Sequence, residues 1–147
     1  MCNLTTGTLI SEKPEIAIAQ DAKGNKVLAT GAEVSQYKKR ASVTVTNPFA
    51  HPRGLVSDFT AGSLVMKAFI KRACSRSLIT PAIVMRPLGE PEGGFTQLEL
   101  RALQEMASFA GSRKFAFWLG PKLSPQKMLA KEFLSEVKTQ LKNLGGA

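Results

Sequence analysis

Few side chains in this sequence are of the types that perform catalysis or bind metal. His51 is the only histidine, which excludes multi-histidine metal sites. A serine hydrolase would need His51 beside Asp21 or Asp58 and a serine on a sharp strand-to-helix turn, and no such elbow is present. Cys2 and Cys74 are the only cysteines, too few for a metal cluster and typical of reduced thiols. We therefore expect no catalytic residues, no metal site and no cofactor.

A glycine- and proline-rich loop at residues 88–94 is the segment most similar to a phosphate-binding loop. It lies between a predicted strand and a predicted helix, where backbone amides can face an anion. However, Glu90 and Glu92 within it would repel phosphate, and it lacks both the dinucleotide spacing and a lysine-serine ending. The loop is therefore predicted to be a connector.

Positive charge is concentrated in the middle of the chain, which has a formal net charge of +9. Between residues 34 and 89 the only acid is Asp58. We expect a positive surface there that meets nucleic acid, an anionic membrane face or an acidic protein, or that is simply solvated. The candidate surface residues are Lys38, Lys39, Arg40, Arg53, Lys67, Lys71, Arg72 and Arg76.

The composition is that of one globular domain. A chain of 147 residues with 44% hydrophobic and 21% charged residues is long and apolar enough to bury a core. Its longest apolar stretches fall short of the roughly 20 residues that span a bilayer, so we expect no transmembrane segment. The start of the sequence lacks the basic and apolar runs of a secretory signal, which predicts a cytoplasmic protein.

The elements that must position these residues alternate between strands and helices. Apolar residues at three- and four-residue spacing from Asp58 to Ala73 predict a helix, and Thr96 with Glu99 forms a capping box before another. Residues 82–85 are apolar throughout, which predicts a central strand buried on both faces. Further strands are expected at residues 4–10, 15–19, 26–30, 43–46 and 114–119, and further helices at 32–40 and 124–144. This order predicts an α/β domain.

Residues 54–59, Gly-Leu-Val-Ser-Asp-Phe, resemble the Gly-Val-Ile-x-Asp-Phe segment that begins a long helix in MreB, the bacterial actin-like filament family. The resemblance continues through residues 64–71, 81–87 and 97–111, and upstream through residues 13–18 and 29–33. It covers roughly residues 4–121. It implies an actin-like (RNase H-like) half domain, in which a mixed sheet is flanked by helices. The whole of 1–147 would be one such N-terminal domain, with a reduced lobe near 32–52 and an extra amphipathic helix at 124–144.

The resembled family hydrolyses ATP between two halves, and this sequence departs from its pattern at three points. If residues 8–10, Thr-Leu-Ile, align with the same triplet of the family, Cys2 stands where the family has a magnesium-associated aspartate and Leu4 where it has glycine. Leu119 and Gly120 replace two glutamates, one of which polarises the attacking water. The chain also ends where a second phosphate loop would follow. The resemblance therefore implies a chain that does not hydrolyse ATP.

Three functions remain as expectations. The first is a non-catalytic MreB-like module that binds protein, either an actin-like filament protein or a second copy of itself, as a regulatory part of a cytoskeletal or cell-envelope assembly. The second is a nucleic-acid or anionic-surface binder that uses residues 38–86. The third, a small enzyme, requires a concave pocket with convergent polar groups.

Overall fold

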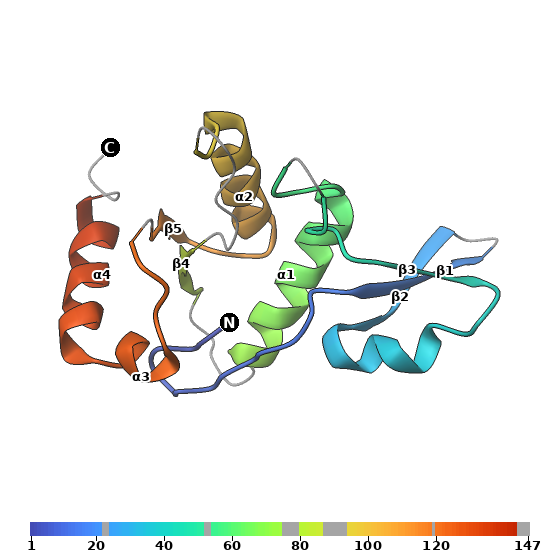
Figure 1. Cartoon of the computed structure of the whole chain (residues 1–147), viewed down its shortest axis with the longest axis horizontal. Coiled ribbons are helices and arrows are strands. Elements are labelled where there is room, and N and C mark those ends of the chain that lie inside the picture. Colours follow the sequence, from blue (N-terminus) through green and yellow to red (C-terminus); the bar gives the residue numbers. More distant parts are fainter. Residues whose placement is uncertain (22–23, 52–53, 75–79, 87–93, 119, 144–147) are drawn as a thin grey trace.

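The structure, a computed structural model, places two small sheets at the two sides of one long helix (Figure 1). It describes residues 1–147 except 22–23, 52–53, 75–79, 87–93, 119 and 144–147. The strands are β1 (Ile16–Asp21), β2 (Gly24–Thr30), β3 (Val43–Thr46), β4 (Ala82–Met85) and β5 (Lys114–Phe117). The helices are η1 (Gly31–Tyr37), which is a 3₁₀ helix, α1 (Phe59–Ala73), α2 (Gln97–Phe109), α3 (Pro125–Met128) and α4 (Lys131–Asn143).

The first sheet is antiparallel, with strand order β2-β1-β3, and η1 packs beside it. Ala17 of β1, Ala29 of β2 and Val34 of η1 form its buried core. The β1–β2 hairpin and β3 confirm the strands predicted at 15–19, 26–30 and 43–46. The lobe expected near 32–52 contains η1 and β3, and both share this core with β1 and β2.

Helix α1 is buried on two faces and joins the halves of the molecule. Its predicted start is confirmed, since the Asp58 carboxylate accepts a hydrogen bond from the Ala61 amide at 2.9 Å. One face, which includes Val65 and Phe69, packs against Ile16 and the N-terminal segment. The other face, with Met66 and Ile70, packs against α2, β4 and β5. Each half of the protein therefore uses α1 as a wall of its core.

The second sheet is parallel and consists of β4 and β5. Ile83 and Met85 of β4 and Phe115 and Phe117 of β5 pack on the α1–α2 cluster. Val84 is also only partly buried, so the prediction that β4 is buried on both faces is wrong. The predicted α/β class is confirmed, but the expected single mixed sheet is two separate sheets, one antiparallel and one parallel.

Two further predictions differ from the structure. Residues 4–10 form a turn rather than a strand, because side-chain hydrogen bonds hold the backbone in a tight loop, and a single bridge joins Cys2 to Leu9. The single helix expected at 124–144 is two helices, α3 and α4. Helix α4 packs on β5, and its Val137 is 5% exposed, whereas Leu129 between the helices is 41% exposed. The break between α3 and α4 therefore lies at an exposed part of the chain.

Candidate functional site

The loop that the resemblance aligns with a phosphate loop has its backbone amides engaged internally. The side-chain oxygen of Asn3 accepts hydrogen bonds from the amides of Thr5 and Thr6 at 2.9 and 3.1 Å. The amide of Gly7 donates to the backbone carbonyl of Asn3 at 2.8 Å. The amide of Thr8 donates to the Thr6 hydroxyl at 3.3 Å. Four successive N–H groups therefore already have acceptors within the loop.

The same asparagine attaches this loop to the end of α1. Its side-chain nitrogen donates to the carbonyl of Ala73 at 2.8 Å and lies 3.7 Å from the Cys74 sulfur. The last carbonyls of a helix have no partner within the helix, so an outside donor such as Asn3 stabilises them. Cys2 and Leu4, the two substituted positions of the resembled loop, are both half-buried beside it.

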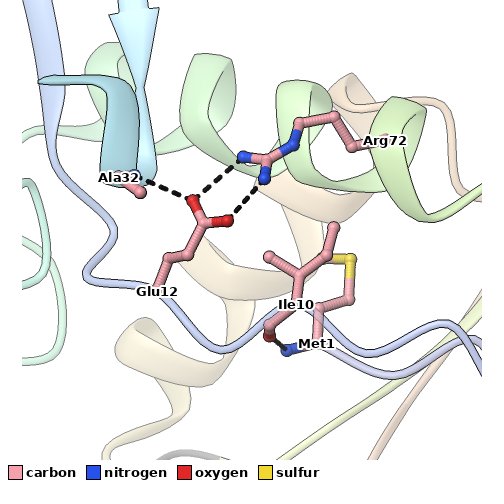
Figure 2. A network of polar contacts seen from close by, with 5 residues as sticks. All are labelled: Met1, Ile10, Glu12, Ala32 and Arg72. Carbon is pink, nitrogen blue, oxygen red and sulfur yellow. Dashed lines mark hydrogen bonds and ion pairs between the residues drawn. The ribbon is translucent and has the colours of Figure 1, made fainter.

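Glu12 links the N-terminal segment to α1 and η1 (Figure 2). Its carboxylate accepts two hydrogen bonds from the Arg72 guanidinium and one from the Ala32 amide at 2.8 Å. The hydrogen bond from Arg72 is the largest cause of a lowered pKa of Glu12, followed by that from the Ala32 amide. The same ion pair raises the pKa of Arg72. Both groups are therefore held in their charged forms.

The predicted basic residues divide between two elements. Lys38, Lys39 and Arg40 follow η1, whereas Lys67, Lys71 and Arg72 lie on α1. Arg53 and Arg76 lie outside the described residues. The sequence pattern missed the acids that come from the N-terminal segment, because they are distant in sequence.

Four of the six described basic residues have a partner. Lys38 pairs with Glu15 at 2.9 Å, and Arg72 pairs with Glu12. Arg40 lies over the ring of Tyr37, and Lys67 lies 5.8 Å from the centre of the Phe109 ring. Much of the expected positive surface is therefore used in contacts within the chain.

The carboxyl end of β5 is filled by aromatic packing. Trp118 makes an edge-to-face contact with Phe133 of α4, with ring centres 5.2 Å apart, and its indole nitrogen donates to the Pro121 carbonyl at 3.0 Å. The Arg86 guanidinium, after β4, donates to the Gly120 carbonyl at 3.0 Å. Leu119, the other replaced glutamate position, lies outside the described residues.

One face of α2 exposes two large apolar side chains that the sequence analysis did not identify, and one of them, Phe109, borders Lys67 of α1. Leu98 is 79% exposed and Phe109 is 60% exposed. They are eleven residues apart, which places them on one side of a helix about 16 Å from each other. Arg101 and Glu105 lie between them and form an ion pair at 3.5 Å. We call these four residues the α2 face. The spacing of eleven residues between Leu98 and Phe109 is the sequence signal that could have revealed this face. The buried Leu103 lies on the opposite side of the helix.

Among the described residues, neither a metal site nor a membrane span is present. No three His, Cys, Asp or Glu side chains gather there in a group that could hold a metal ion. No helix within the described ranges combines the length and the apolar character that crossing a bilayer requires. Within the described part of the chain, a small polar cavity of about 80 Å³ is lined by Ser108, Ser112, Arg113 and neighbouring residues of α2 and β5. A volume near that of a few water molecules holds no substrate-sized ligand.

Two kinds of comparison with known proteins agree on the family. The MreB/Mbl protein model matches residues 4–121. The cell shape-determining protein MreB of Escherichia coli K12 is 30% identical over 113 residues, covering 74% of this chain and 31% of that protein. MreB of Haemophilus influenzae is 29% identical over 110 residues, with the same coverage. The chain thus spans 31% of the length of these relatives.

Solved structures show the same fold. MreB5 of Spiroplasma citri bound to ADP superposes with a TM-score of 0.58 at 19% identity, covering 77% of this chain and 32% of that one. The AMPPNP-bound form of MreB5 gives the same TM-score over 76% of this chain. The fold of α1, α2 and the two sheets is therefore that of one part of an actin-like protein, and the chain belongs to the MreB/Mbl family.

Proposed function

We propose that this chain is a non-catalytic MreB-like module that works by binding protein, and that its partner is a second copy of the chain. The observation that carries the proposal is the α2 face, where Leu98 and Phe109 stand exposed on either side of the Arg101–Glu105 ion pair. Large apolar side chains exposed on the same face of a helix are a usual mark of a protein interface.

The arrangement of charges on the α2 face favours a second copy over an unrelated protein. In a two-fold symmetric pair the same surface contacts itself, and the two α2 helices run antiparallel when the axis is perpendicular to them. Leu98 of one copy then lies near Phe109 of the other, because the two residues are five and six positions from Leu103, the middle of the helix. Arg101 of one copy similarly faces Glu105 of the other. Apolar residues thus meet apolar residues and opposite charges meet.

The non-catalytic part of the proposal is supported by the N-terminal loop and by the resemblance. Backbone amides that bind phosphate must point at the ligand, and those of Thr5, Thr6, Gly7 and Thr8 donate within the loop. Cys2 offers a thiol where a hard magnesium ion prefers carboxylate oxygen. We therefore expect no ATP hydrolysis.

Sedimentation velocity over a wide range of protein concentration tests the protein-binding role. We expect the native chain to show a sedimentation coefficient that rises with concentration, and Leu98→Glu or Phe109→Glu to abolish that rise. Leu129→Glu is the matched control, since Leu129 is an exposed apolar residue of another segment, and it should behave as the native chain does.

A charge exchange tests the antiparallel arrangement. Arg101→Glu should weaken association by placing two acids opposite each other, and the double variant Arg101→Glu/Glu105→Arg should restore it. A native chain that stays monomeric at every concentration contradicts the second-copy partner. If that monomer co-sediments with filaments of an MreB relative, the partner is the relative, and the protein-binding role stands.

A further inference from the structure

The Asn3–Thr8 loop has the shape of an anion site but not its free donors. Successive backbone N–H groups in a tight turn form a concavity that binds anions such as phosphate, and Gly7 supplies the positive φ of 73° that such a turn uses. A ligand would have to compete with acceptors that belong to the protein. The Asn3 carboxamide oxygen already receives the amides of Thr5 and Thr6.

The position of the loop also disfavours an anion. Asn3 docks on the carbonyl of Ala73, the last residue of α1. The carboxyl end of a helix carries a partial negative charge, which attracts cations and hydrogen-bond donors and repels phosphate. The neutral carboxamide of Asn3 suits both the loop and the helix end. Its oxygen accepts hydrogen bonds from loop amides, and its nitrogen donates one to the helix carbonyl. A phosphate group offers no N–H donor for the helix.

We propose that the Asn3 side chain takes the place of a bound anion in this loop. The loop is then a structural tie between the N-terminal segment and α1 rather than a nucleotide site. The inference rests on the proposed non-catalytic function and names the residue that closes the site. The residues present therefore do not fit the nucleotide that the ADP- and AMPPNP-bound structural relatives contain.

Amide hydrogen exchange and chemical shifts of the full chain, measured by NMR, test the tie. In the native chain we expect protected amides at Thr5 and Thr6, and no shift of either when inorganic phosphate or Mg·ADP is added. Asn3→Ala should accelerate their exchange by roughly fivefold or more, the factor that one hydrogen bond of ordinary net strength gives.

Asn3→Asp separates the acceptor role of the side chain toward the loop from its donor role toward α1. It also provides a test of the tie if the alanine variant does not fold. The carboxylate keeps an acceptor for the amides of Thr5 and Thr6, so their protection should remain. It has no donor for Ala73 and places a negative charge at the end of α1, so the amide signals of Ala73 and Cys74 should shift and the thermal midpoint should fall.

Two results would overturn the tie: loop amides of the native chain that shift with Mg·ADP, or an Asn3→Ala variant with unchanged exchange at Thr5 and Thr6. Failure of the tie and failure of the proposed function remain distinguishable. ATP turnover without a shift of the loop amides would reject the non-catalytic function and leave the tie intact. Unchanged exchange in Asn3→Ala, in a chain that binds no nucleotide, would reject only the tie.

Discussion

Arg72, on the last turn of α1, donates hydrogen bonds from both terminal nitrogens of its guanidinium to the carboxylate of Glu12, sixty residues earlier in the sequence. The geometry is the two-point pairing in which arginine and a carboxylate interact most strongly. Because Glu12 also accepts from the Ala32 amide, one side chain connects α1, the N-terminal segment and η1. The first predictions concern this contact.

Replacing Glu12 with glutamine should lower the free energy of unfolding by about 1–2 kcal/mol, since a charge-assisted pair and part of its geometry are lost at a partly exposed site. Urea unfolding followed by circular dichroism measures the change. Glu105→Gln, measured at a protein concentration at which the chain is monomeric, is the control, because it removes an exposed ion pair on a single helix and should change stability by less than about 0.5 kcal/mol. Equal changes in the free energy of unfolding for the two substitutions would show that the Glu12–Arg72 contact stabilises the fold no more than an exposed ion pair does.

The pH dependence of stability should also report this contact. The pKa of Glu12 is lowered in the folded state by Arg72 and the Ala32 amide, so its contribution is fully present above its unfolded pKa, near 4.5. That contribution is lost as pH falls through the lower folded pKa, where the carboxylate takes up a proton. Denaturation midpoints measured from neutral pH into this acidic range should therefore fall less steeply in Glu12→Gln than in the native chain. Parallel curves for both would contradict the lowered pKa.

Gly31→Ala should be severely destabilising for two separable reasons. Gly31 has a φ of 69°, which strains any residue with a side chain, and its added methyl group would overlap the Glu12 carboxylate. Gly111→Ala is the matched control, because Gly111 has a φ of 95° with nothing near its added methyl group, and it should cost only the backbone strain of about 1 kcal/mol. The difference between the two variants in thermal unfolding measures the overlap of the added methyl group with its neighbours, Glu12 and the Phe69 ring.

Thr96→Ala should lower stability by about 1 kcal/mol, because the Thr96 hydroxyl accepts from the Glu99 amide and completes the capping box of α2. Thr139→Ala removes a hydroxyl that only bonds to a carbonyl one turn earlier on the exposed side of α4. This control should leave the urea midpoint almost unchanged. A Thr96→Ala midpoint equal to that of Thr139→Ala would argue against the cap.

Trp118, the only tryptophan, gives a direct readout of the packing of α4. Phe133→Ala should shift its fluorescence emission to longer wavelength, because the edge-to-face contact is lost and water reaches the indole. Leu129→Ala should leave the spectrum unchanged, since Leu129 is exposed between α3 and α4. An unshifted spectrum in Phe133→Ala would mean that α4 does not cover Trp118 in solution.

Local features of the fold could be predicted from the sequence because their causes are local. The apolar spacing and Asp58 gave the correct start of α1, and the Thr96–Glu99 pair marked the start of α2. The strand pattern of the first sheet likewise reflects side-chain alternation and a short hairpin. These elements need no knowledge of the neighbours that later pack on them.

Features that depend on distant partners could not be predicted in this way. The charge pattern indicated a basic surface, but Glu12 and Glu15 come from outside the basic segment and pair with Arg72 and Lys38. The pattern at residues 4–10 is compatible with a strand, and the turn depends on the hydrogen bonds of the Asn3 side chain, one of which reaches the distant end of α1. Partial exposure of β4 likewise depends on which strands pair with it, information that no local pattern contains.

The position of α1 between the two sheets has a consequence for how the chain can be divided. The clusters on its two faces share this helix as a common wall, so neither has a complete core without it. A recombinant fragment that ends before Phe59 would lose one wall of the antiparallel half, and one that begins after Ala73 would lose a wall of the parallel half. The chain should consequently unfold in one cooperative transition, as a single domain with a shared core does.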